Sequence, residues 1–234
     1  MSVATNISLI KERMSAAARR AGRSPHDIAL MAVSKTQPVE RIREAYEAGQ
    51  RLFGENRVQE FAGKAEALRD LYEAEWHMIG HLQTNKATKT ADLFRAVQSV
   101  DSLRLAEKLD AAARNLGKTL DTLIEINLGG EVAKSGVAPD SPALEELLAA
   151  APRLQALVFR GLMTVPPLAD DPQDARPYFR RLREARDAIA ARRLPAIVLS
   201  ELSMGMSHDF EIAIEEGSTC VRVGTALFGE RIKA

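Results

Sequence analysis

The chain has 234 residues, enough for one large domain or two small ones with a sizeable core. Its 32 basic and 32 acidic side chains cancel, so no overall charge favours binding to nucleic acid or to a membrane. A single cysteine excludes an intramolecular disulfide framework, and the absence of a visible signal peptide or membrane-length apolar run predicts a cytoplasmic protein.

Short apolar runs alternate with segments of helical periodicity along the chain. After a helix over 7–21 that stops at Gly22, the pattern predicts eight strands, each followed by a helix. The predicted strands are 28–36, 51–53, 76–82, 96–100, 120–128, 156–165, 196–202 and 219–223. The predicted helices after them are 38–48, 58–72, 85–94, one capped by Asp101 or Ser102 that runs to Leu116, 142–150, 174–192, 207–216 and a short one from Ala226.

Eight strand–helix pairs predict a single (β/α)8 TIM-type barrel with an extra N-terminal helix. We therefore expect one domain over 1–234, with the N-terminal helix within 1–24 and the barrel over 28–229. An open doubly wound sheet would normally need fewer strands, and no linker-like stretch divides the chain. The longest irregular segments, 129–141 and 166–173, both follow strands, where the loops of a barrel carry function.

Lys35 closes the first apolar run, just before a Gln-Pro loop signal. Lysine is almost never fully buried without a partner, and burial lowers its pKa toward the nucleophilic amine that a Schiff base requires. The same segment is also compatible with a strand-end lysine that reaches into solvent. Other unusual residues also fall at the carboxyl ends of predicted strands, and in a barrel these ends share one face. They are Glu55, Asn56, His81, Asn127, Ser203, Gly205, Gly224 and Thr225.

The ends of the seventh and eighth strands suggest a phosphate site. Leu202-Ser-Met-Gly-Met-Ser207 offers Ser203, Gly205 and a predicted N-cap at Ser207, and Val221-Arg-Val-Gly-Thr225 offers Gly224 and Thr225. Barrel enzymes often bind phosphate with these two loops, through backbone N–H groups that glycine lets a ligand approach. Either loop alone would read as an ordinary turn or cap, but both at the expected positions favour phosphate binding.

Arg222 is predicted to point into the barrel, because its two valine neighbours would face the helices. A guanidinium there needs an acceptor, for which Glu125, Glu201 or a ring nitrogen of a ligand are the candidates. An amine, a phosphate site and an inward arginine together indicate a site for pyridoxal 5′-phosphate (PLP).

Several motifs resemble those of the pyridoxal phosphate homeostasis protein family, which is similar to the N-terminal barrel of bacterial alanine racemases. They are Ala32-Val-Ser-Lys-Thr36, Phe53-Gly-Glu-Asn56 with Gln59-Glu60, Trp76-His-Met-Ile-Gly80 with Leu82-Gln83 and Asn85-Lys86, Gly161-Leu-Met-Thr164, and the two phosphate-site loops. The resemblance implies that Lys35 forms the Schiff base and that Arg222 contacts the pyridine nitrogen. It implies further that Asn56 lines the cofactor face and that phosphate is held by Ser203, Gly205, Gly224 and Thr225. His208 departs from the family pattern, where we expect an acidic residue.

Three functions are compatible with such a site. The first, implied by the resemblance, is a PLP carrier that limits free aldehyde, could pass PLP to PLP-dependent apoenzymes, and has no catalytic residue or robust turnover. The second is an amino-acid racemase that uses Lys35 with His81 or a water. The third is a cofactor-free Schiff base with a phosphorylated sugar. An arginine beside the pyridine nitrogen disfavours its protonation and carbanion chemistry, and the three tyrosines (Tyr46, Tyr72 and Tyr178) fall on predicted helices, so no second base is evident.

The remaining candidate residues give weaker indications of function. His77 and His81 lie four apart on a strand without a helical metal motif, so we expect structural or cofactor-facing roles and no metal site. Lys134 could reach the pocket or decorate a loop, and Cys220 is expected in the core. We expect a monomer that binds neither nucleic acid nor a membrane.

Overall fold

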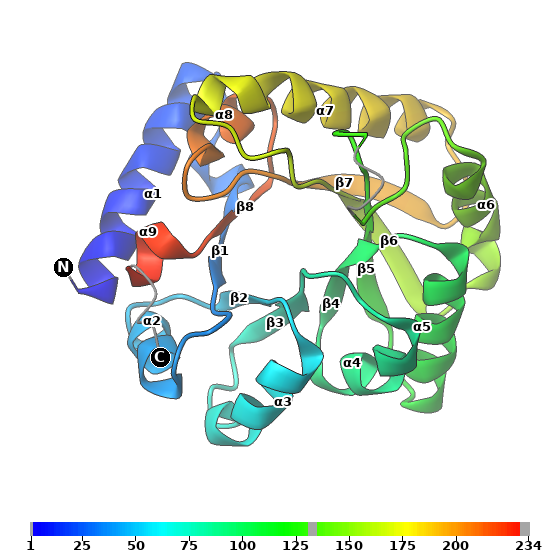
Figure 1. The fold of residues 1–234 in the computed structure, drawn as a ribbon, viewed down its shortest axis with the longest axis horizontal. Helices are drawn as coiled ribbons and strands as arrows, with labels where there is room; N and C mark the ends of the chain where they lie inside the picture. The colour runs from blue at the N-terminus through cyan, green and yellow to red at the C-terminus, as the bar shows by residue number, and fades with distance from the viewer. Residues whose placement is uncertain (1, 131–134, 230–234) are drawn as a thin grey trace.

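The computed structural model describes residues 2–130 and 135–229, in which eight parallel strands close into a barrel in the order of the chain. Figure 1 shows the helices forming a ring around these strands. The predicted fold class, a (β/α)8 TIM-type barrel with an extra N-terminal helix, is confirmed.

The strands are short and the helices longer, as the two periodicities indicate. The strands are β1 (Ala29–Val33), β2 (Leu52–Glu55), β3 (Glu75–Met78), β4 (Ala96–Val100), β5 (Leu120–Glu125), β6 (Leu157–Met163), β7 (Ile197–Ser203) and β8 (Cys220–Val223). The α-helices are α1 (Val3–Arg20), α2 (Val39–Glu47), α3 (Val58–Ala65), α4 (Ala87–Leu93), α5 (Leu103–Asn115), α6 (Pro142–Ala150), α7 (Arg176–Ala191), α8 (Phe210–Glu215) and α9 (Thr225–Phe228). Short 3₁₀ turns are η1 (Pro25–Asp27), η2 (Glu66–Leu68), η3 (Thr84–Lys86), η4 (Ala151–Arg153) and η5 (Pro172–Ala175).

Helix α1 covers the side of the barrel where the first and last strands meet. Its N-cap Ser2 accepts a hydrogen bond from the Thr5 amide, and its buried face repeats at helical spacing through Val3, Ile7, Ile10, Met14 and Ala17. This face packs on α8, α9 and α2, as Figure 1 shows for the blue helix. Because β1 pairs with β8, with Met31 opposite Arg222, the helix supports the part of the barrel that carries Lys35 and Arg222.

Several predicted helix boundaries differ in the structure, and the first helix begins at Val3 and not at residue 7. Helix α8 begins at Phe210 and not at Ser207, because the Asp209 carboxylate accepts the Met206 amide hydrogen bond at 2.6 Å and holds the preceding residues in a turn. The helix predicted over 58–72 ends at Ala65 and continues as a 3₁₀ turn, and Asp174 lies in the 3₁₀ turn before α7. Among the described residues, no helix has the length and apolar character that crossing a membrane would require.

Candidate functional site

The turn that carries Lys35 is fixed by contacts from α3. Thr36 adopts φ +61°, the left-handed region that a threonine rarely occupies. Its amide donates to Glu60 Oε1 at 2.5 Å, and Lys64 Nζ donates to the same oxygen at 2.7 Å and to the Ser34 carbonyl at 3.2 Å. A partly buried network therefore holds the backbone on both sides of Lys35. Glu60 belongs to a family motif in the sequence, but its contact with Thr36 was not predicted.

Lys35 lies beside the end of the eighth strand. It lines a small depression with Val33 and Thr36 from the first strand end, and with Gly224 and Thr225 from the last. A Cβ on Gly224 would lie 3.5 Å from the Val33 side chain, so the two strand ends are in van der Waals contact. The structure thus brings together three of the predicted site residues, Lys35, Gly224 and Thr225.

Arg222 points into the barrel, as its strand position predicts, and is only 4% exposed. Its Nη1 donates to Ser203 Oγ at 2.7 Å and its Nη2 to the Thr164 carbonyl at 2.8 Å. Among the described residues no carboxylate bonds this guanidinium directly; the charges of Asp209 and Glu125 act on it from a longer distance, and Glu201 is not a partner. A buried cation with neutral partners alone is costly, which leaves Arg222 suited to a ligand that offers an acceptor.

The Ser203 hydroxyl has two side-chain partners inside the barrel. Ser203 is the last residue of β7 and fully buried, and its hydroxyl donates to Gln98 Oε1 at 2.6 Å while accepting from Arg222. In this structure the Ser203 hydroxyl is therefore bonded within the barrel interior. The hydroxyl of the same motif that reaches the eighth strand end is that of Ser207, which accepts from the Ala226 amide at 3.3 Å.

Gly205 is required by packing and by its backbone conformation. Its φ is +93°, and a Cβ there would lie 2.5 Å from the Ala213 Cβ of α8. Its carbonyl accepts from the Arg222 amide at 2.9 Å. The predicted residue thus lies between β8 and α8, where it lets the Ser203–Ser207 segment approach the eighth strand.

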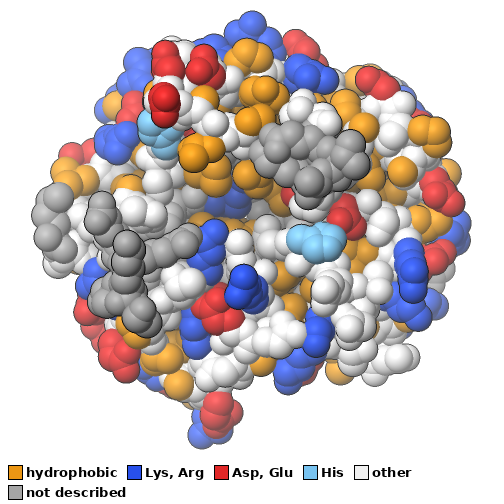
Figure 2. Space-filling view, in the orientation of Figure 1, with side chains coloured by type: hydrophobic (Ala, Val, Ile, Leu, Met, Phe, Trp, Pro, Cys, Tyr) orange, Lys and Arg blue, Asp and Glu red, His pale blue; other side chains and the backbone are white. Residues whose placement is uncertain are grey.

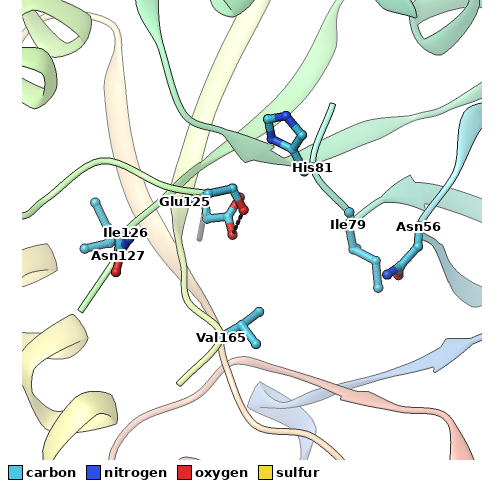
Figure 3. A pocket seen from close by; sticks show the side chains of 9 residues that line it. Asn56, Ile79, His81, Glu125, Ile126, Asn127 and Val165 are labelled. Carbon is cyan, nitrogen blue, oxygen red and sulfur yellow. Dashed lines mark hydrogen bonds between the residues drawn. The ribbon is translucent and has the colours of Figure 1, made fainter. Parts of the chain in front are cut away.

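A larger pocket, of about 600 Å³, opens at the same ends of the strands. Its lining residues are Asn56, Ile79, Gly80, His81, Glu125, Ile126, Asn127, Ser135 and Val165. Figure 3 shows Asn56 and Ile79 on one side and Glu125 and Asn127 facing them across the space. A Cβ on Gly80 would lie 2.4 Å from the Asn56 carbonyl oxygen, so glycine permits the approach of the β2 and β3 ends. In the space-filling view, the face is hollowed over the centre of the barrel, with basic side chains in the hollow (Figure 2).

Glu125 is the most unusual group of this pocket. It is 7% exposed; Oε1 accepts from the Ser135 hydroxyl at 2.9 Å, and Oε2 is buried without a hydrogen-bond partner. Burial raises the pKa of this carboxyl above its ordinary value. The unpartnered oxygen can therefore hold a proton, or accept one from a ligand in the pocket. The sequence had suggested Glu125 only as a partner of Arg222.

We expect Glu125→Gln to remove a pH-dependent loss of stability. When the pKa of a carboxyl is raised in the folded state, its ionisation destabilises that state. The loss of stability is therefore complete above the folded pKa and absent below the ordinary glutamate value of about 4.3. The free energy of unfolding of the variant relative to wild type should therefore rise between about pH 4 and 8, by roughly 1 kcal/mol or more. Urea titrations across this range measure it, and a pH-independent difference would contradict the burial argument.

The histidines have separate environments. His81 lines the pocket with a largely exposed side chain, and its Nδ1 lies 3.2 Å from Asp101 Oδ2. His77 lies on β3 with Nδ1 at 3.0 Å from Gln98 Nε2. Within the described part of the chain, no three metal-ligating side chains come together. His208 is exposed at 3.1 Å from the Asp170 carbonyl, and Lys134 lies outside the described residues.

None of the three tyrosines is at the end of a strand. Tyr46 is in α2 beneath the Arg51 guanidinium, Tyr178 is in α7 against the core, and Tyr72 is 89% exposed in a turn after η2. Cys220 is buried, and burial raises the pKa of its thiol to about 11. A tyrosine acid or base at the strand ends therefore has no candidate in this chain, whose three tyrosines are all described.

The chain is similar to known proteins over nearly its whole length. The family model for the alanine racemase N-terminal domain matches residues 5–232. A protein of Aquifex aeolicus named pyridoxal phosphate homeostasis protein is 48% identical over 231 residues, which cover 99% of each chain. The protein of the same name from Escherichia coli (strain K12) is 42% identical over 236 residues, covering 98% of this chain and 97% of the relative.

Solved structures of similar fold include one member with bound PLP and one alanine racemase. PipY of Synechococcus elongatus, determined with PLP bound, matches with a TM-score of 0.82 and 38% identity, covering 97% of this chain and all of PipY. An alanine racemase of Clostridium difficile matches with a TM-score of 0.71 at 16% identity, covering 99% of this chain and 57% of the racemase. The second likeness is one of fold alone.

Proposed function

The chain belongs to the pyridoxal phosphate homeostasis protein family, and on that premise we propose that it binds PLP reversibly through a Schiff base on Lys35. The observation that carries the proposal is the placement of Lys35, the Gly224–Thr225 segment and the buried Arg222 at one end of the barrel. These supply an amine for the aldehyde, polar backbone for the phosphate and a donor for the ring nitrogen. The PipY structure with PLP bound supports it from a relative.

The covalent step needs no protein group besides Lys35 and releases one water. The neutral Nζ attacks the aldehyde carbon, a carbon–nitrogen double bond forms, and the aldehyde oxygen leaves as water with the two amine protons. Hydrolysis reverses the step and releases PLP. The contacts of Glu60 and Lys64 with the turn around Lys35 would keep the amine in place during both directions.

For the phosphate we propose Ser207, Gly224 and Thr225, with Gly205 letting the first of these loops approach. Ser207 replaces the predicted Ser203 because its hydroxyl lies at the Ala226 amide, beside Gly224. The role we propose for Ser203 is to hold Arg222. Asn56 would line the cofactor face from the β2 end.

We propose that turnover is weak or absent. An arginine donating to the ring nitrogen opposes protonation of that nitrogen by like-charge repulsion, which makes the ring a poor sink for electrons. PLP stabilises a carbanion less well when its ring is a poor sink. The chain would then limit free aldehyde in the cell. Delivery of PLP to PLP-dependent apoenzymes, a monomeric state and a cytoplasmic location stay predictions.

One contact favours the racemase alternative. The His81 imidazole lines the pocket next to the Asp101 carboxylate, which could orient it as an acid or base. Exchange of the α-hydrogen of alanine for deuterium, measured with the PLP-loaded protein, separates the two functions. We expect no exchange beyond that of free PLP; exchange that disappears in His81→Phe would establish the racemase.

The binding proposal is tested by mixing the purified chain with PLP and reducing it with borohydride. A visible absorbance band should appear before reduction, and peptide mass mapping should place the reduced pyridoxyl phosphate on Lys35. A colourless mixture with no added mass would leave the cofactor-free sugar Schiff base as the remaining function. Label on another lysine would contradict the assignment of the site.

A further inference from the structure

Four polar side chains form a continuous line of hydrogen bonds through the barrel interior. Arg222 Nη1 is 2.7 Å from Ser203 Oγ, and Ser203 Oγ is 2.6 Å from Gln98 Oε1. Gln98 Nε2 is 3.0 Å from His77 Nδ1. Arg222, Ser203 and Gln98 are 4%, 0% and 1% exposed, so water does not compete for these bonds. The line joins β8, β7, β4 and β3.

The groups at the two ends of the Ser203 contacts fix the direction of the bonds. A guanidinium can only donate, so the Ser203 oxygen accepts from Arg222, and an amide oxygen can only accept, so the Ser203 proton goes to Gln98 Oε1. The Gln98 amide nitrogen must then point to His77 and donate to Nδ1. His77 therefore accepts at Nδ1 and, as a neutral imidazole, carries its proton on Nε2.

The surroundings of His77 favour this neutral form. Burial lowers its pKa to about 4, opposed by the Asp121 carboxylate and assisted by Arg95. The Nε2 side faces a cavity of about 400 Å³ at the amino-terminal ends of the strands, where Glu75 Oε2 lies 3.9 Å away. The charged and titratable groups of that cavity are His26, Asp27, Glu75, Glu201 and Cys220. The line thus runs from the proposed PLP site toward the opposite mouth of the barrel.

We propose that Gln98 and His77 are positioning residues for Arg222, acting through Ser203. The inference rests on the proposed function, because Arg222 matters through its contact with the PLP ring nitrogen. Arg222 has no carboxylate partner among the described residues, so its orientation depends on two neutral acceptors. The hydroxyl acceptor can rotate unless its own proton is held, and Gln98 holds it. His77 in turn keeps the Gln98 amide from flipping.

The direction of the line is tested in the free protein, without PLP. Long-range ¹H–¹⁵N spectra of the imidazoles should show His77 as the Nε2–H tautomer, unchanged between about pH 5 and 8. The Nδ1–H tautomer, or a titration within that range, would overturn the inference whether or not the chain binds PLP. In Gln98→Glu, the isosteric carboxylate accepts from both neighbours, so His77 should become doubly protonated at neutral pH.

The coupling to Arg222 is tested by adding PLP. In wild type, the His77 nitrogen signals should shift on PLP binding, although His77 lies at the far end of the line. In Gln98→Leu that shift should vanish and the PLP dissociation constant should rise about five- to tenfold. The matched control is Gln155→Leu, an exposed position outside the line.

The two proposals fail in different ways. An unchanged PLP affinity in both Gln98 variants would refute the positioning role, and a purely structural role would not transmit a PLP-dependent shift to His77. Should Gln98→Leu not fold, the isosteric Gln98→Glu carries the same test, with an expected several-fold loss of affinity. A wild type that binds no PLP, but shows the predicted His77 tautomer, would refute the proposed function and with it the positioning role, leaving only the hydrogen-bond line.

Discussion

Lys35→Ala should lose covalent retention of PLP entirely, and its PLP dissociation constant should rise by roughly a hundredfold or more, about 2.7 kcal/mol of binding free energy. Without the amine, no carbon–nitrogen bond can form, and only the phosphate and ring contacts remain. Borohydride reduction followed by intact mass measures the covalent part, and equilibrium dialysis measures the affinity. The free energy of unfolding of the free protein should change little, because Lys35 is only half-buried.

Lys89→Ala is the matched control, since Lys89 is an exposed lysine of α4 that pairs with Asp92. It should bind and retain PLP as wild type does. Added mass that persists in Lys35→Ala would move the Schiff base to another lysine, of which Lys134 would be the first to map. Loss of retention in both variants would instead indicate a general effect of lysine removal.

The fold could be predicted because its signals are local. Each strand is a short apolar run, and each helix has its own period, so the alternation alone indicates a barrel. The boundaries of β4 and α6 agree with the prediction to the residue. The start of α8 was wrong because Ser207 and Asp209 can both cap a helix, and only the turn held by the Met206 amide decides between them.

The sequence predicted which strand ends come together at the site, but not which side chains hydrogen-bond to one another there. Lys35, Gly224 and Thr225 could be placed together because barrel topology brings the ends of β1 and β8 together. Ser203 was assigned to a loop because β7 was expected to stop at Leu202. It is one residue longer, which turns the Ser203 side chain inward. Because side chains alternate along a strand, Ser203 faces the same side as Glu201 once the strand includes it.

The supports of Arg222 lay beyond sequence reasoning for a different reason. Ser203, Gln98 and Thr164 are separated from Arg222 by 19 to 124 positions in the chain, and they meet only because strands across the barrel have a particular stagger. No local pattern specifies that stagger. The predicted carboxylate partner was a reasonable default for a buried arginine, and its absence among the described residues is what directs attention to a ligand.

Arg222→Met should separate binding from stability. Removing the guanidinium removes a charge-assisted donor to the PLP ring, so the PLP dissociation constant should rise about ten- to a hundredfold. The free protein should stay folded, with a free energy of unfolding within about 2 kcal/mol of wild type. This follows because the loss of two hydrogen bonds is offset by relief from burying an unpaired cation.

Urea titration of the free protein and PLP titration by absorbance measure these two quantities on the same samples. Arg153→Met, which removes an exposed arginine paired with Glu107, should change neither appreciably. If Arg222→Met binds PLP as tightly as wild type, Arg222 does not contribute to PLP binding and the prediction is wrong. If binding weakens while stability holds, Arg222 is retained for the ligand, since the fold itself gains little from a guanidinium that only a hydroxyl and a carbonyl accept.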